Sequence, residues 1–510
     1  MRVWFWLLLF IGVIVSLVLL WATSAPLGIP GEWEWRREVP EPDFLWNLVG
    51  AAAAAALLVA FVESGRRRLS TVCRSSEVAV WLTALVAVSM TWLWVVQEAS
   101  PIKSRLGKSA FVLYYASSSG YFTKARYQSP DPAEFLATYE DLMRERDVLH
   151  VGTHPPGLFL VFHGLIAICQ NPAVASCLDM TMSPSFQEAC DIIARTSALS
   201  EPPRPLLPGD RRVLWAATLL VMITASLSVI PLYVLVRRTE TAAVAWCAAA
   251  LWTAVPAVAI FIPKSDVAYA FVGLMMVLSW TTAVNRSSVL LAFFAGVTTW
   301  LGLLMSLAFL PVALFMAIVG QRDVSQMTRD ETLASAHAIQ LPPVKCLVSG
   351  AVGFLLPIGL LFWRFQINLV AVWILNFQNH AAFYGSYPRT YWKWLLVNPV
   401  EFALAAGWPV ALLAAQSLWL CVRSRPTTKS LVPAGVLFVG GLLWLTGKNS
   451  GEAARLWIVF LPWLVWLAGM QISRFDDQRV FGRFHPIIAI LGLQLLVCLL
   501  TVVRISGFEM

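Results

Sequence analysis

The sequence predicts an all-α polytopic membrane protein with about 13 transmembrane helices and a long outer-face loop that contains short juxtamembrane helices. The 510 residues have a mean hydropathy of +0.70 and only 13% charged residues, about half of the roughly 25% found in soluble domains. Many uncharged apolar runs approach the roughly 20 residues that cross a bilayer. These runs are continuous rather than alternating, which excludes a membrane β-barrel.

The first predicted span runs from Val3 to about Leu20. Its alternative is a signal peptide, but the run is long and Trp21-Ala22-Thr23-Ser24-Ala25 is a weak cleavage context, which favours a retained span. The 288–320 run is too long for one span and predicts a hairpin that turns near Gly302. The other apolar runs are 46–63, 78–96, 213–236, 241–262, 267–284, 346–367, 395–421, 430–446, 456–472 and 486–504.

The distribution of arginine and lysine predicts the orientation. Cytoplasmic loops are enriched in these residues, and Arg66-Arg67-Arg68 lies between spans two and three, which places the N-terminus in the cytoplasm. The other basic loops fall on the cytoplasmic side only if Leu158–Cys169 does not cross the membrane. This short apolar stretch therefore predicts an interfacial or re-entrant helix. The same rule explains the net charge of +8 without nucleic-acid binding. The remaining inner basic residues are Arg74, Arg237, Arg238, Arg286, Arg322, Arg423, Arg425, Lys429, Arg474, Arg479 and Arg483.

This orientation divides the chain into three parts. Residues 1–77 hold two N-terminal transmembrane helices, residues 78–286 form a core module with the long outer loop 97–212, and residues 287–510 supply the C-terminal helices. The C-terminal part carries the outer loops 376–394 and 447–455. Because the unusual polar residues gather on the outer face, the functional site is expected there.

The strongest local pattern is Thr153-His154-Pro155-Pro156-Gly157, followed at once by an apolar stretch. Proline fixes φ and is tolerated in the first turn of a helix, so a helix is expected to begin directly after this corner. His154 would then lie beside a helix N-terminus, a position that favours anions such as phosphate. The alternative is a helix start at which His154 merely caps.

An apolar span, a long outer loop, the His-Pro-Pro corner and a span ending in Arg237-Arg238 resemble the GT-C membrane glycosyltransferases. The branch that this layout resembles most is that of the protein mannosyltransferases and aminoarabinose transferases. The resemblance covers about 78–286, and residues 1–77 would be an addition before the shared core. It implies an enzyme that moves a sugar from a polyprenyl-phosphate donor to a lipid, glycan or protein acceptor at the outer face.

The resemblance also implies an acidic residue early in the long loop, acting as the general base on the acceptor. The sequence departs from this pattern, since Glu98 is the only acid between Gln97 and Gln128. Asp131 and Glu134 are the next candidates, although Asp131 after Ser129-Pro130 is also a good helix cap. Loss of the base, leaving a non-catalytic relative, is an open alternative.

Candidate substrate-binding residues lie in three outer segments. Asp266 follows Lys264 at the mouth between two spans, where it either holds sugar hydroxyls or pairs with the lysine. Arg455, at the start of a span, suits a lipid phosphate because its planar fork matches phosphate bidentately. The alternative is an i, i+3 pair with Glu452. The resemblance supports a phosphate-binding role for Arg455.

The loop 376–394 supplies His380, Arg389 and Tyr391 as further candidates. Its aromatic and basic residues either contact sugar and phosphate or form an interfacial aromatic belt. No metal-ligand spacing appears among the eight cysteines; a divalent metal is compatible with the sequence but not indicated by it. Cys169, Cys177 and Cys190 cluster in the outer loop, where two of the three could form a disulfide.

Three hypotheses follow. The first is a glycosyltransferase with a polyprenyl-phosphate-sugar donor in the bacterial plasma membrane, with the endoplasmic reticulum as the alternative location. The second is a transporter or lipid flippase. Ionisable residues in mid-span and duplicated halves are typical of such proteins, but here the former are sparse and the latter are not found. The third is a non-catalytic membrane protein that retains the fold, because fold alone does not establish function.

Overall fold

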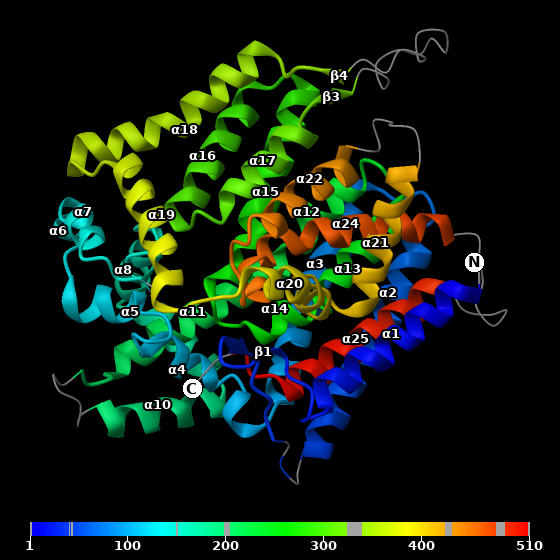
Figure 1. The fold of residues 1–510 in the computed structure, drawn as a ribbon, viewed down its shortest axis with the longest axis horizontal. Coiled ribbons are helices and arrows are strands. Elements are labelled where there is room, and N and C mark those ends of the chain that lie inside the picture. The colour runs from blue at the N-terminus through cyan, green and yellow to red at the C-terminus, as the bar shows by residue number, and fades with distance from the viewer. Residues whose placement is uncertain are drawn as a thin grey trace.

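The computed structural model describes residues 3–39, 41, 44–148, 151–197, 204–323, 339–423, 431–475 and 485–507. The described chain is almost entirely α-helical, as predicted, and its only strands are two short hairpins (Figure 1). Four predicted inner basic residues, Arg425, Lys429, Arg479 and Arg483, lie outside the described residues.

The N-terminal region begins with a helix, a small hairpin and two long helices. The hairpin pairs Gly28 with Glu34 and Ile29 with Trp33 in antiparallel register, and Arg37 forms an isolated bridge with Ile505 near the other end of the chain. Residues 28–37 are called the N-terminal strap below. The elements are α1 (Val3–Trp21), β1 (Gly28–Ile29), β2 (Trp33–Glu34), α2 (Phe44–Leu69) and α3 (Ser75–Glu98).

The long loop predicted over 97–212 contains a series of short helices. Of these, α8 begins at Gly157, directly after the two prolines, as the sequence predicted. It meets α9 at a bend of 103°, the geometry of a broken span or a re-entrant loop. The elements are η1 (Ile102–Ser104), α4 (Lys108–Tyr114), α5 (Tyr121–Thr123), a π-helical turn (Lys124–Gln128), α6 (Pro132–Ala137), α7 (Tyr139–Arg144), α8 (Gly157–Ile168), α9 (Pro172–Thr181) and α10 (Pro184–Ser197).

The middle of the chain forms a packed group of apolar helices. A Cβ added at Gly296 of α16 would lie 2.0 Å from the Gly350 carbonyl oxygen of α18, so glycine allows these two helices to pack at close range. Figure 1 shows the pair side by side. The elements are α11 (Pro208–Leu227), α12 (Val229–Val236), α13 (Ala242–Thr253), α14 (Pro256–Ile260), α15 (Ser265–Arg286), α16 (Val289–Met305), α17 (Phe309–Val319), β3 (Arg322–Asp323) and β4 (Ile339–Gln340).

The C-terminal helices pack both against the central helices and against the N-terminal helices. Helix α25 runs beside α1 (Figure 1). The apolar segment that contains α24 is 83% buried inside the protein, whereas that of α18 is only 17% buried. The elements are α18 (Val344–Phe365), α19 (Leu369–Ser386), α20 (Tyr391–Ala406), α21 (Trp408–Arg423), α22 (Leu431–Leu445), α23 (Ala453–Leu456), η5 (Ile458–Phe460), α24 (Leu461–Ile472), η6 (Ser473–Phe475) and α25 (Pro486–Arg504).

Eight described helices are long and apolar enough to cross a membrane, and ten if each of two bent pairs counts as one span. By length and composition, the chain is a multi-pass integral membrane protein. Four shorter apolar helices, α13, α16, α17 and α22, fall within other predicted runs. Where a hairpin was expected near Gly302, α16 continues to Met305 and α17 begins at Phe309.

The predicted run 395–421 is divided into α20 and α21, which meet at 116°. Gly407 lies between them with φ of +82°, a conformation that glycine adopts without strain. Gln494 of α25 stabilises this bend, because its Nε2 donates to the Ala406 carbonyl and its Oε1 accepts from Val410 N. The bend therefore separates α20, which reaches the candidate site, from α21.

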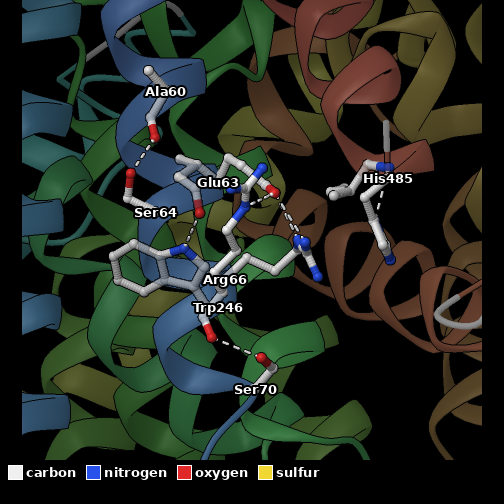
Figure 2. Close-up of polar contacts among 10 residues, drawn as sticks. Ala60, Glu63, Ser64, Arg66, Ser70, Trp246 and His485 are labelled. Atoms are coloured by element: carbon white, nitrogen blue, oxygen red, sulfur yellow. Dashed lines mark hydrogen bonds and ion pairs between the residues drawn. The ribbon is translucent and has the colours of Figure 1, made fainter. Parts of the chain in front are cut away.

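Arginines end helix α2 in a compact ion-paired cluster (Figure 2). Glu63 accepts from Arg66 Nε at 2.7 Å and from Arg67 Nε at 2.5 Å. Trp246 of α13 donates its indole N–H to the Val62 carbonyl at 2.8 Å, which fixes the neighbouring helix. At about 1.5 Å per residue, this cluster lies roughly 30 Å along α2 from the end that follows the N-terminal strap.

Candidate functional site

A cavity of about 480 Å³ opens where several distant segments meet. It is lined by the N-terminal strap, residues near the His-Pro-Pro corner, the start of α15, one face of α19, α20 and the segment 449–456. Five of the seven predicted substrate-binding residues line it: His154, His380, Arg389, Glu452 and Arg455. The structure thus brings most of these predicted residues into one space.

The His154 corner is held in place by α7 and α19. The His154 carbonyl accepts from the Tyr139 hydroxyl at 2.6 Å and from Asn376 Nδ2 at 3.2 Å. Asn379 donates to the Gly152 carbonyl at 2.9 Å. Because both asparagines are buried, these bonds stabilise the corner and fix the backbone that carries the His154 ring.

Helix α19 covers most of the segment expected as an outer loop over 376–394. His380, Phe383, Tyr384 and Tyr387 recur at helical spacing and line the cavity together. The Tyr384 hydroxyl accepts from Asn449 N at 2.8 Å, which joins this aromatic wall to the segment before Arg455. Burial and the positive charge of Lys448 lower the pKa of His380, so its ring is neutral at pH 7.

The N-terminal strap closes one side of the cavity through Glu32. Its carboxylate accepts from Thr390 N at 2.8 Å, Thr390 Oγ1 at 2.6 Å and Trp394 Nε1 at 2.7 Å. Burial acts to raise the pKa of Glu32, but these hydrogen bonds and the charge of Lys393 lower it to about 2. Arg389 donates to the Glu32 carbonyl, so the strap is fixed to the start of α20.

The cavity is rich in cations. Arg455 pairs with Glu452 at 2.6 Å, which is the i, i+3 pair considered as an alternative above. Its Nε, however, is buried with no hydrogen-bond partner among the described residues. Lys264, predicted only as a partner for Asp266, also lines the cavity and donates to the Ser118 carbonyl. Burial and the charge of Arg455 lower the pKa of Lys264 to about 7.

Asp266 and Tyr391 lie outside this lining. Asp266 is in the first turn of α15. Burial acts to lower the pKa of Arg455, but the negative charges of Glu452 and Asp266 raise it. Tyr391 donates to the Leu445 carbonyl at 2.7 Å and is 50% exposed. Asp266 therefore acts on the cavity through its charge on Arg455, while Tyr391 does not line it.

The three candidate bases are placed away from the cavity lining. Glu98, the last residue of α3, accepts from the Ser185 hydroxyl at 2.7 Å. Asp131 caps α6 by accepting from Ala133 N at 2.8 Å, as its capping alternative predicted. Glu134 is exposed in the first turn of the same helix.

Metal and disulfide chemistry have no support in the described part of the chain. No group of three or more His, Cys, Asp or Glu side chains there is arranged to hold a metal ion. All eight cysteines are described and free, with Cys169 and Cys190 buried and Cys177 exposed. The disulfide considered among these three is not formed.

Sequence reasoning missed the N-terminal strap and Glu401. Residues 1–77 were treated as an addition before the core, yet Trp33, Trp35 and Glu32 form part of the cavity. The charged and aromatic run Glu32-Trp33-Glu34-Trp35-Arg36 was the available signal. Glu401, an acid inside an apolar run, was another, since such residues are costly unless used or paired.

Comparison with protein-family models and with curated proteins finds no match to this chain. The functional assignment therefore depends on the residues of the cavity and their chemistry.

Proposed function

We propose that the chain is a membrane glycosyltransferase that transfers a sugar from a polyprenyl-phosphate donor to an acceptor at the outer face. The proposal includes a GT-C-like arrangement of about 13 spans, a cytoplasmic N-terminus and a bacterial plasma membrane. The observation that carries it is the buried Arg455 Nε without a partner in the described chain, in a cavity with Lys264 and Arg389.

A phosphate would supply the hydrogen-bond acceptors that Arg455 Nε and Arg389 Nε lack in the described part of the chain. A guanidinium has five N–H donors, and that of Arg455 is joined to Glu452 through one nitrogen while another faces no acceptor. Arg389 Nε is likewise buried without a partner in the described part of the chain. An anionic group between them would accept charge-assisted hydrogen bonds, which are stronger than neutral ones.

The aromatic residues suit a sugar beside that phosphate. Trp33 and the α19 face with Phe383, Tyr384 and Tyr387 present ring faces and hydroxyl groups around the same space. A cavity of about 480 Å³ falls in the usual size range for small-molecule sites, roughly 300–1,000 Å³. The lipid tail would extend into the bilayer, where apolar helices are exposed.

The test is native mass spectrometry of protein purified in mild detergent. We expect a copurified polyprenyl phosphate or its glycoside, and we expect Arg455→Ala to lose it. Arg67→Ala, at the ion-paired end of α2, is the matched control and should retain the lipid. Bulk phospholipid alone, unchanged by Arg455→Ala, would overturn the proposal and favour a transporter or a non-catalytic protein.

A further inference from the structure

The carboxyl groups in the cavity differ in how fully their oxygens are used. Glu32 accepts from Thr390 and Trp394 and lies 3.5 Å from Lys393 Nζ. Glu452 is paired with Arg455. Glu34 is exposed on β2. The fourth lining carboxyl group, that of Glu401, is the one that is both buried and incompletely bonded.

Glu401 lies on α20 and is 6% exposed. Its Oε1 accepts from Ala454 N at 3.1 Å and from Trp35 Nε1 at 3.3 Å. Its Oε2 is buried and has no hydrogen-bond partner within the described residues. Burying a carboxylate oxygen without a partner is costly, so a free oxygen that lines a polar cavity calls for a ligand that it contacts.

The position of Glu401 is suited to proton transfer beside the phosphate site. Its partner Ala454 immediately precedes Arg455 in the chain, and both Glu401 and Arg455 line the same cavity. The two hydrogen bonds to Oε1 come from opposite ends of the sequence and fix the carboxyl group in orientation. A general base must lie within hydrogen-bond reach of the acceptor, and a fixed carboxyl group that lines the cavity offers its free oxygen to an acceptor bound there.

We propose that Glu401 is the general base of the transfer reaction, an inference that rests on the proposed function. Glu401 Oε2 accepts the proton of the acceptor hydroxyl or amine while the acceptor oxygen or nitrogen bonds to the anomeric carbon. The bond between that carbon and the phosphate oxygen breaks. Its electron pair leaves with the polyprenyl phosphate, whose charge Arg455 stabilises.

The substitution that tests this role is Glu401→Gln. Glutamine keeps an oxygen that accepts from Ala454 N and Trp35 Nε1, but it replaces the free carboxylate oxygen with a group that cannot take a proton. We expect kcat for release of sugar from undecaprenyl phosphates carrying mannose or aminoarabinose to fall about 100-fold or more. We expect affinity for undecaprenyl phosphate and the apparent unfolding temperature to stay unchanged.

Two further variants separate catalysis from structure. Glu63→Gln makes the same chemical change in the ion-paired cluster of α2 and should retain full kcat. Glu401→Asp keeps a carboxylate but shortens it, so it weakens the bonds to Trp35 and Ala454. A base predicts that Glu401→Asp has a higher kcat than Glu401→Gln, whereas a purely structural role predicts the reverse order, even if both variants are less stable.

The dependence of kcat on pH supplies an independent readout. In the wild type kcat should fall at low pH as the base becomes protonated, and Glu401→Gln should lack this fall. The other titratable and charged groups around the cavity are the same in both proteins, so the difference between the two profiles reports Glu401. Those groups are Glu32, Glu34, Arg36, His154, Lys264, Asp266, His380, Arg389, Glu452 and Arg455.

The outcomes are distinct. Full activity in Glu401→Gln, or loss of activity in Glu98→Gln instead, would overturn the role of Glu401 while leaving the proposed function intact. Equal loss of kcat and of undecaprenyl phosphate affinity would also overturn it, since the residue would then be structural. A wild-type protein that neither binds undecaprenyl phosphate nor releases sugar would instead refute the proposed function itself.

Discussion

The two polar regions of the molecule use their charges differently. At the end of α2, Glu63 pairs with Arg66 and Arg67, and Arg68 pairs with Glu77, each pair being separated by at most nine residues of chain. In the cavity, Arg389 bonds to Glu32 across 357 residues and Trp35 bonds to Glu401 across 366. The first region is built locally, while the second exists only when the whole chain is folded.

The two regions also differ in what is left unpaired. Glu63 uses both of its oxygens on arginines of its own helix. Arg389, Arg455 and Glu401 each retain a buried polar atom without a partner among the described residues. Buried polar groups in native proteins are nearly always bonded, so this difference supports the ligand site that we propose in the cavity and a structural role for the α2 cluster.

The largest expected effect is that of Arg455→Ala on affinity for undecaprenyl phosphate. Removing one member of a buried, hydrogen-bonded charge pair costs about 2–5 kcal/mol, which is at least about 30-fold in Kd. Arg455→Lys should recover part of the affinity but not the bidentate geometry. Binding is measured by quenching of tryptophan fluorescence, with Arg67→Ala as control. Equal losses of affinity in Arg455→Ala and Arg67→Ala would show that the cavity and the α2 cluster do not differ in lipid binding.

Glu32→Ala should cause the next largest effect, on stability. It removes the acceptor of three hydrogen bonds and leaves Trp394 Nε1 buried without one, at a cost of about 2–3 kcal/mol. The apparent unfolding temperature should therefore fall, whereas Glu34→Ala on the exposed neighbour should change little. An unchanged unfolding temperature in Glu32→Ala would show that the strap is not held through this residue.

Glu32 also predicts the direction of a pH effect. Its pKa in the folded protein is about 2, below the ordinary value of 4.5, so the unfolded state binds more protons between these pH values. The stabilising contribution is therefore complete above pH 4.5 and is lost as the pH falls toward 2. The unfolding temperature of the wild type should fall more steeply over this range than that of Glu32→Gln. Parallel profiles would contradict the assignment.

The sequence predicted what depends on local pattern. Apolar runs placed the eight long helices, and the two prolines placed the start of α8 at Gly157. His154, Arg389 and Arg455 were found because each stands in a segment that the sequence predicts to be on the outer face. Local pattern could not show that α19 would replace part of a loop, since Asn376 and Asn379 hold this helix against the corner by tertiary hydrogen bonds.

The strap and Glu401 were missed for a physical reason. Their importance comes from contacts between residues hundreds of positions apart, such as Trp35 with Glu401, and no periodicity encodes such pairs. Glu98 shows the converse. It was a candidate base because it is the only acid between Gln97 and Gln128, yet it accepts from the Ser185 hydroxyl and does not line the cavity. Position along the chain does not predict the neighbours of a side chain.

A smaller effect is expected from the titration of Lys264. Its pKa of about 7 means that the ammonium group loses its proton as the pH rises from 6 to 8, so affinity for a phosphodiester lipid should fall up to about tenfold. A phosphodiester such as mannosyl undecaprenyl phosphate keeps one negative charge over this range and contributes no titration of its own. Lys264→Met should bind weakly with a flatter profile. A slope unchanged in that variant would show that the effect does not come from Lys264.

The smallest effect should come from Glu63→Gln. One of the two ion pairs that it changes is with Arg67, which is 73% exposed, and exposed ion pairs contribute about 0–1 kcal/mol. The other is with Arg66, which is 13% exposed, and there glutamine keeps an oxygen that accepts from the guanidinium. The unfolding temperature should therefore fall only slightly, and Kd for undecaprenyl phosphate should not change, because α2 separates this cluster from the strap by roughly 30 Å. A large loss of binding would mean that the two ends of α2 are coupled. The cavity could then no longer be treated as a site independent of the ion-paired cluster.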